Sequence, residues 1–237
     1  MGFKTREEAQ SVALVDAQLA WAHLLSGEYV APHSVRLGGR GKLVNKSAKE
    51  TVDAGVPKGR LILMLSQRDL LLLGNVETPL TTAYKPSRYP VSVGMGWYGG
   101  NVTEFIERLI PLEKFFCMDA EKYDASLDPW LVRDAVSIVR TQFVGGDDPK
   151  YDMYWEFVVE SLLSAPIARD DGWVMTKDVG TTSGHSFNTL IQSICTLMVG
   201  YAALFDLVPD EDWDRLWQEA ELEALGDDNL TGLPEWL

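Results

Sequence analysis

The chain has 237 residues, of which 46% are hydrophobic and 24% charged, the composition of a globular protein with a buried core. Two cysteines and three histidines are too few for a disulfide framework or a zinc cluster, so we expect a reducing compartment. The net charge of −14 argues against simple nucleic-acid binding, because proteins that bind phosphate usually present a basic surface.

The N-terminal region and the cysteines support an intracellular-type chain. Residues 3–8 are polar apart from Phe3, which predicts that no signal peptide is present. Cys117 and Cys195 each lie in an apolar run, and we predict that both are buried free thiols.

Charge is distributed unevenly along the chain. Residues 206–237 hold many acids and one base, Arg215, whereas residues 36–68 hold only two acids, Glu50 and Asp53. The bases of that second stretch are Arg36, Arg40, Lys42, Lys46, Lys49, Lys58, Arg60 and Arg68. Such a division fits a solvated surface, and it also fits a phosphate-facing arm opposite a metal-binding pole.

The hydrophobic pattern predicts a mixture of helices and short strands without internal repeats. We expect an amphipathic helix over residues 5–26, an irregular Gly- and Lys-rich arm over 33–59, and a strand over 61–65. A buried helix begins at 70–73, a Gly-rich loop covers 94–100, a helix follows over 102–109, and a buried strand covers 114–118.

Asp128 and Pro129 have the pattern of a helix start, with the acid as N-cap and proline in the first helical position. The apolar face of that helix consists of Leu131, Val132, Ala135, Val136 and Val139. Further helices are expected over 154–163 and 187–205, and a hairpin strand over 173–176. The helix over 187–205 is long enough to span a membrane, but its six polar or small residues favour a buried core helix.

Three segments contain residues suited to chemistry. In the first, the strand over 114–118 ends at Asp119, and Asp124 follows five positions later. A carboxylate at the end of a strand can bind a divalent cation at the rim of a sheet, and the second acid can face the same cavity. Asp at a strand end is also ordinary turn chemistry, and the segment alone does not separate the two readings.

The second segment is Gly226-Asp227-Asp228-Asn229, which lies between short hydrophobic stretches and predicts a tight β-hairpin. Carboxylates from different strands are needed to hold two Mg²⁺ ions roughly 3.5–4 Å apart. The alternative is an acidic surface turn. Gly146-Asp147-Asp148 repeats the three letters before Pro149, and we predict that this copy is such a turn.

The third segment, residues 180–186, is a Gly- and Ser-rich loop that precedes the helix over 187–205. Glycines allow close approach to a nucleotide, and a helix N-terminus offers backbone N–H groups. A capped loop without a ligand is the plain alternative.

The order of these segments resembles motifs A, B and C of viral RNA-dependent RNA polymerases of the picornavirus-like and partitivirus-like supergroup. Asp119-Ala-Glu-Lys-Tyr-Asp124-Ala-Ser-Leu is similar to motif A. Gly55-Val-Pro-Lys58-Gly-Arg60-Leu-Ile62 resembles motif F, the basic fingers segment, and falls in the basic stretch. Four motifs in the family's order are much more specific than one.

The resemblance implies an α+β fold: a right-hand polymerase palm, with an antiparallel sheet flanked by helices, part of the fingers, and no thumb. Residues 1–113 would be mainly fingers, with the motif F arm over 42–68. Residues 114–237 would be palm, with motif A over 118–127, motif B over 180–196 and motif C over 224–233.

The resemblance also implies the roles of single residues. Asp119, Asp227 and Asp228 would be catalytic and would bind two Mg²⁺ or Mn²⁺ ions. The nucleotide would contact Lys58, Arg60, Asp124, Ser183, Gly184, Asn188 and Gln192. The reaction is attack of a primer 3′-hydroxyl on the α-phosphate of a ribonucleoside triphosphate opposite an RNA template. The expected location is the host cytoplasm, or the particle of a double-stranded RNA virus.

The chain departs from the family pattern in three places. Motif B has Asn188 where Thr is usual and Gln192 where Asn is usual, which changes the reach of that side chain to Asp124. The strand before Gly226 carries Glu221 and Glu223. Because only nine residues follow Asp228, motifs D and E and the thumb have no room, and we expect a fragment that elongates RNA poorly.

Two alternatives from other classes stay open. One is a reverse transcriptase-like palm polymerase, against which Asp124 argues, because those enzymes exclude ribose with a bulky side chain. The other is an acidic binding domain or an inactive polymerase remnant.

Overall fold

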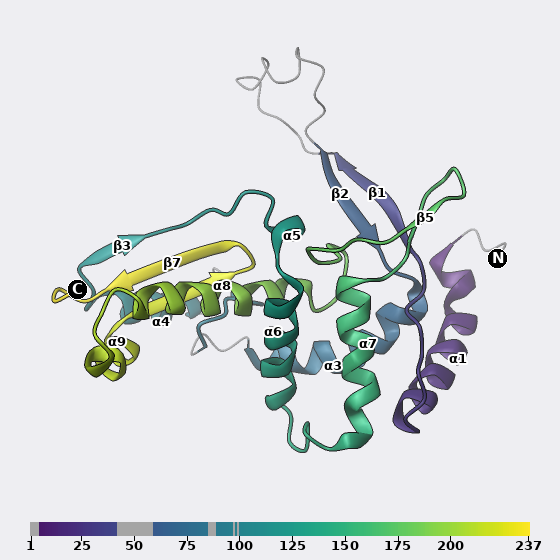
Figure 1. Ribbon diagram of the computed structural model, residues 1–237, viewed down its shortest axis with the longest axis horizontal. Helices are drawn as coiled ribbons and strands as arrows, with labels where there is room; N and C mark the ends of the chain where they lie inside the picture. Colours follow the sequence, from purple (N-terminus) through teal and green to yellow (C-terminus); the bar gives the residue numbers. More distant parts are fainter. Residues whose placement is uncertain (1–4, 42–58, 85–88, 97, 99) are drawn as a thin grey trace, which may run out of the picture.

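The computed structural model describes residues 5–41, 59–84, 89–96, 98 and 100–237, and combines helices with two small sheets (Figure 1). The α-helices are α1 (Arg6–Leu25), α3 (Gln67–Tyr84), α4 (Asn101–Leu109), α5 (Tyr123–Ser126), α6 (Pro129–Thr141), α7 (Asp152–Leu163), α8 (Asn188–Phe205) and α9 (Trp213–Glu219). The strands are β1 (Val35–Gly41), β2 (Gly59–Met64), β3 (Lys114–Phe116), β4 (Ile167–Ala168), β5 (Val174–Met175), β6 (Glu221–Leu225) and β7 (Asp228–Leu233). Two 3₁₀ turns are η2 (Pro149–Tyr151) and η3 (Asp210–Asp212).

The first sheet has the strand order β2-β1-β4-β5. Strands β1 and β2 pair antiparallel from Arg36–Met64 to Gly41–Gly59, and this ribbon projects from the body of the molecule (Figure 1). The irregular arm predicted over 33–59 was therefore wrong for β1, because regular pairing with β2 compensates for the low strand propensity of its glycines. Residues 42–58 lie outside the described part of the chain.

The second sheet has the order β3-β7-β6 and is antiparallel throughout. Helix α8 lies along this sheet (Figure 1). The two approach closely at Gly200, where an added Cβ would lie 2.5 Å from a methyl carbon of Leu222. The segment before α4 pairs with β6 through a parallel bridge between Val91 and Ala224. The structure thus confirms the mixed α+β class and an antiparallel sheet flanked by a helix.

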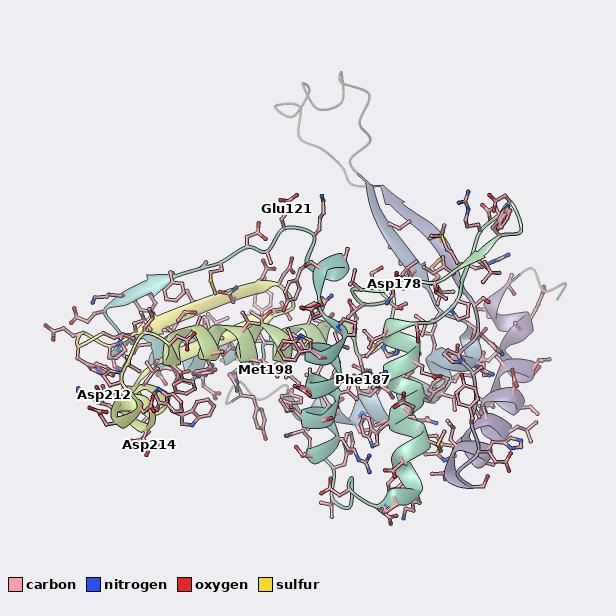
Figure 2. All side chains as sticks on the ribbon, in the orientation of Figure 1. Glu121, Asp178, Phe187, Met198, Asp212 and Asp214 are labelled. Carbon is pink, nitrogen blue, oxygen red and sulfur yellow. The ribbon has the colours of Figure 1, made fainter. Side chains whose placement is uncertain are left out.

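The core lies where α6, α7 and α8 pack together, and the whole predicted apolar face of α6 is buried there. Figure 2 shows Phe187, which is fully buried, between these helices. Helix α8 is long and apolar enough to cross a membrane by composition, and 56% of it is buried inside the protein. That burial agrees with the predicted core helix.

Two predictions about burial were wrong. Helix α1 forms where expected and buries one side with Ala17, Ala20 and Leu24, but the predicted polar outer face is not polar, since Val12, Val15 and Leu19 are exposed on it. Strand β3 is exposed along its length, and so is Cys117, whereas Cys195 is buried as predicted. The physical reason is position: β3 is the edge of its sheet, and α8 packs against β6, the opposite edge.

Candidate active site

A pocket of about 730 Å³ lies where α5, the N-terminal part of α8, strand β2 and the β6–β7 turn meet. This volume is in the range of small-molecule sites. Five residues predicted from the motifs line it, which are Asp124, Ser183, Asn188, Gln192 and Asp227. Residues more than 100 positions apart in the sequence are therefore brought together.

The β6–β7 hairpin has the predicted tight turn. Pairing continues to Leu225 and Asp228, so Gly226 and Asp227 are the two turn residues. Gly226 has φ +67°, and a positive φ at the first turn position alone is typical of the type II′ turn, which favours glycine there. Backbone geometry thus explains why glycine precedes the two aspartates.

Asn229 connects this hairpin to the segment that carries Asp119. Its side-chain amide donates to the carbonyl of Met118 at 2.9 Å, and its carbonyl oxygen accepts from the Met118 N–H at 3.2 Å. The side chain holds Met118, the residue before Asp119, next to β7 beyond the last β3–β7 pair, Phe116 and Thr231. The sequence pattern contained Asn229 but assigned it no role.

Asp124 and Gln192, the pair whose reach the longer glutamine was expected to change, are hydrogen-bonded to each other. The Gln192 side-chain nitrogen donates to the Asp124 carboxylate and also to the Thr181 hydroxyl, at 3.1 Å for the latter. The longer glutamine therefore does reach Asp124. Its two N–H groups fix the carboxylate and the loop before α8 relative to each other.

The loop over 180–187 packs closely on the motif A segment. Gly180 has φ +77°, and an added Cβ would lie 2.3 Å from the Asp124 carbonyl oxygen. The Gly180 N–H donates to Leu127 and the Thr181 N–H donates to Asp124, at 2.8 and 2.7 Å. Only glycine fits here, for both conformation and space.

The same loop contacts the edge of the first sheet. The Ser183 hydroxyl accepts from the Leu63 N–H at 3.2 Å and donates to the Leu61 carbonyl at 3.4 Å. A Cβ on Gly184 would lie 2.2 Å from the Leu63 carbonyl oxygen. Ser183 thus satisfies polar groups of the edge strand β2, which contains the last four residues of the predicted motif F.

Lys177 binds this loop to the end of α7. Its ammonium group donates to the carbonyls of Leu162, Leu163 and Gly180 at 2.6, 2.7 and 2.8 Å. Burial lowers the pKa of Lys177 to about 8. The carbonyls at the helix C-terminus favour the protonated form, which therefore prevails at neutral pH.

His185 is a buried, neutral member of the same loop. Its Nδ1 accepts from the Phe187 N–H at 3.1 Å, so Nε2 carries the proton and donates to Ser161 at 2.8 Å. Burial is the main cause that lowers the pKa of His185 to about 3. Neither Lys177 nor His185 was singled out by the sequence motifs.

The acidic residues fit a divalent metal in chemistry, but they form no closed cluster. Asp119 and Asp228 are exposed and Asp227 is half-buried. Within the described residues, no three side chains of Asp, Glu, His or Cys gather closely enough to hold a metal ion. Figure 2 shows Glu121 on the outer side of the β3–α5 segment, pointing away from α8. The metal-binding roles of the three aspartates stay predictions.

The acidic residues of the C-terminal region other than Asp227 do not line the pocket. Figure 2 shows Asp212 and Asp214 at α9, at the end of α8 away from α5. Glu223, buried in β6, accepts from Ser92 at 2.5 Å and pairs with Arg108 at 2.8 Å, and Glu221 pairs with Arg108 at 3.2 Å. The unusual acids of this strand thus have a cation from α4 as their partner.

The other Gly-Asp-Asp, residues 146–148, lies in the turn after α6, as predicted. Asp147 and Asp148 are both exposed. The 13 residues of α6 separate this turn from α5, a length of about 20 Å at 1.5 Å per residue. Neither aspartate lines the pocket.

The basic residues are only partly described. Lys58 lies outside the described residues, and for Arg60 only the backbone is described, paired with Arg40 in the β1–β2 ribbon. Arg68 is buried, pairs with Asp69 at 2.7 Å and donates to the Ala31 carbonyl at 2.7 Å. Arg68 therefore does not belong to a phosphate-facing surface.

The family model for viral RNA-dependent RNA polymerases matches residues 48–235, which includes every predicted site residue. The chain belongs to this family. The resemblance seen in the motifs is thereby confirmed, and the polymerase family implies a palm-type fold for the sheet and helices described above.

Three genome polyproteins are similar to this polymerase chain. Those of beet mosaic virus, pea seed-borne mosaic virus (strain DPD1) and ryegrass mosaic virus (isolate Denmark/Danish) are 26%, 31% and 29% identical over 151, 145 and 147 residues. The matched segments cover 61%, 60% and 59% of this chain. The chain spans about 4% of the length of each polyprotein.

Proposed function

We propose that this chain contains the nucleotidyl-transfer site of an enzyme that copies viral RNA from an RNA template. The observation that carries the proposal is the pocket that joins Asp124, Gln192 and Asp227 from three separate segments. Residues 1–113 are mainly fingers and 114–237 palm in this proposal. The whole polymerase acts on template, primer and ribonucleoside triphosphates, in the host cytoplasm.

Asp119 and Asp227 are the proposed ligands of two Mg²⁺ or Mn²⁺ ions, with Asp228 as a weaker third. Carboxylate oxygens suit these hard cations, and the Asn229–Met118 hydrogen bonds support the approach of the two segments. When bound, the ions lower the pKa of the primer 3′-hydroxyl and neutralise the leaving pyrophosphate. The protein's part is to hold the carboxylates on rigid strand ends.

Asp124 and Gln192 are the proposed sensors of the ribose 2′-hydroxyl. Their mutual hydrogen bond fixes the carboxylate at the wall of the pocket. Asn188 lines the same pocket, and its buried side-chain oxygen has no hydrogen-bond partner among the described residues, so it is a ready acceptor for a ligand donor. This set argues against a reverse transcriptase, which would exclude ribose there.

Ser183 and Gly184 are proposed to contact template and nucleotide from the motif B loop. Lys58 and Arg60 are proposed to bind the triphosphate. Support for the latter comes from β2, which lines the pocket at Leu61 and Ile62, directly after Arg60. A guanidinium offers bidentate contact to phosphate.

The test is Mn²⁺-dependent binding of ATP to the purified chain, measured by tryptophan fluorescence. Asp227→Asn is expected to weaken the Mn²⁺-dependent component at least about 100-fold, beyond the roughly 10–100-fold typical of outer-shell partners. Gln192→Leu is expected to reduce the preference for ATP over 2′-deoxy-ATP. A nucleotide affinity that is equal with and without Mn²⁺, and unchanged in Asp227→Asn, would contradict the proposal.

A further inference from the structure

Both backbone groups of Gly226 are hydrogen-bonded to side chains of helix α8. The Gly226 N–H donates to the Ser193 hydroxyl at 2.8 Å, and the Thr196 hydroxyl donates to the Gly226 carbonyl at 2.7 Å. Ser193 and Thr196 are three positions apart, so they project from the same face of the helix. Ser193 is fully buried and Thr196 is 8% exposed.

The shortest contacts of this network give one arrangement in which each hydroxyl group donates its proton once. Ser193 donates its hydroxyl proton to the Thr189 carbonyl at 2.7 Å, which leaves a lone pair for Gly226. With the Thr196 proton on Gly226, the Tyr123 hydroxyl donates to Thr196 at 2.8 Å, a closer acceptor than the Gln192 carbonyl at 3.3 Å. Burial raises the pKa of Tyr123 to about 12, so the phenol keeps this proton at neutral pH.

Thr196 therefore connects two segments that carry predicted site residues. Tyr123 precedes Asp124, and Gly226 precedes Asp227. A two-residue turn at the tip of a hairpin has few other restraints, so side chains that hold its backbone fix the direction of the next carboxylate. Metal ligands need such support to stay within a fraction of an ångström of their working geometry.

We propose that Thr196, together with Ser193, is a positioning residue that sets the Asp227 carboxylate relative to the motif A segment for metal binding. The proposal rests on the proposed function, because it assumes that Asp227 is a metal ligand. In this proposal helix α8 carries Gln192 and also holds the Gly226–Asp227 turn through the hydroxyl groups of Ser193 and Thr196.

Thr231 offers a matched control within the same hairpin. It is fully buried on β7, and its hydroxyl has no hydrogen-bond partner among the described residues. Thr231→Val makes the same chemical change as Thr196→Val without removing a hydrogen bond. Only Thr196→Val leaves the Gly226 carbonyl without its hydroxyl donor.

The experiment measures the Mn²⁺ concentration that half-saturates ATP binding to the full chain, with urea unfolding of each variant in parallel. Thr196→Val is expected to raise this concentration roughly fivefold to tenfold, the factor for losing about one hydrogen bond. Thr196→Ser keeps the hydroxyl and is expected to stay within about twofold of the unchanged chain. Thr231→Val is expected to have no effect on Mn²⁺.

The outcomes separate this proposal from the proposed function. If Asp227→Asn abolishes the Mn²⁺ dependence but Thr196→Val shifts it no more than Thr231→Val, the positioning role is wrong and the function stands. If Asp227→Asn changes nothing, the function itself is wrong. Should Thr196→Val fail to fold, Ser193→Ala decides: a several-fold shift in Mn²⁺ with normal unfolding supports positioning, and no shift overturns it.

Discussion

The chain contains Gly-Asp-Asp twice, and the two copies lie in different surroundings. In the copy that ends at Asp148, the partners are local: Arg140 donates to the Gly146 carbonyl at 2.7 Å, and Asp148 accepts from the Lys150 N–H at 3.0 Å. In the copy at the β6–β7 turn, Gly226 is bound by side chains of α8, about 30 residues earlier in the chain.

This difference shows why three letters do not define a site. A turn whose hydrogen bonds come from its own neighbours can sit anywhere on the surface. A turn bound by a distant core helix is fixed relative to everything else that helix touches, here Tyr123 and the pocket. The function of the tripeptide therefore depends on which element supplies its partners.

The largest expected effect separates the aspartates of the two copies. The double substitution Asp147→Asn with Asp148→Asn is expected to leave Mn²⁺-dependent ATP binding unchanged, whereas Asp227→Asn lowers it at least about 100-fold. The reason is that neither Asp147 nor Asp148 lines the pocket. Loss of Mn²⁺ dependence in the double variant would mean that the wrong copy has been assigned to the metal.

The glycines of the two copies are required for different reasons, which gives a second comparison. An added Cβ on Gly146 would lie 2.3 Å from the Arg140 carbonyl oxygen, so Gly146→Ala is expected to destabilise the fold by about 2–3 kcal/mol through overpacking. Gly226→Ala meets only Gln192 at 3.6 Å but must adopt φ +67°, which costs about 1–2 kcal/mol.

Function should move in the opposite order to stability for these glycines. Gly226→Ala is expected to weaken Mn²⁺-dependent ATP binding, since the turn precedes Asp227, and Gly146→Ala is expected to leave it intact in the folded fraction. Urea unfolding and Mn²⁺ titration of both variants check this. Equal losses of Mn²⁺ affinity would remove the distinction between the copies.

Acid should affect the loop beside the pocket through His185. The folded protein holds His185 neutral, with its pKa lowered to about 3 from 6.5, and the unfolded chain takes up a proton in this window. Its contribution to stability is therefore full above pH 6.5 and decreases by about 1.4 kcal/mol per pH unit as the pH falls towards 3.

The measurement for His185 is the free energy of unfolding against pH in the unchanged chain and in His185→Gln, which does not titrate. The variant is expected to be less stable at neutral pH and to have a shallower acid slope. Two parallel curves would show that His185 is accessible to protons in the folded state.

The smallest expected effect concerns Asp148, in the Gly-Asp-Asp after α6. The pKa of Asp148 is lowered, first by the hydrogen bond from the Lys150 N–H and then by the Lys150 side chain. This group therefore adds stability above its usual pKa of 3.8, and the gain is lost as the pH falls through the folded value. Asp148→Ala should lower the thermal midpoint slightly at neutral pH and not at all in strong acid, and an equal drop at both would contradict the ion pair.

The sequence by itself determined the elements whose cause is local. Asp128 and Pro129 predicted the start of α6, and the apolar period predicted its buried face. Gly226, Asp227, Asp228 and Asn229 between short hydrophobic stretches predicted the β6–β7 turn. The order of the motifs gave the family, because a motif recurs with the fold. These inferences needed only neighbours along the chain or a shared pattern.

Only the tertiary structure decided burial and partnership across long distances. Strand β3 has an apolar sequence yet lies exposed. It is one edge of its sheet, and helix α8 packs against β6, the opposite edge. Arg108 neutralises Glu223 from 115 positions away, and Thr196 joins Tyr123 to Gly226. Hydrogen bonds and ion pairs of this kind depend on ångström-scale placement of packed elements, which no periodicity in the sequence encodes.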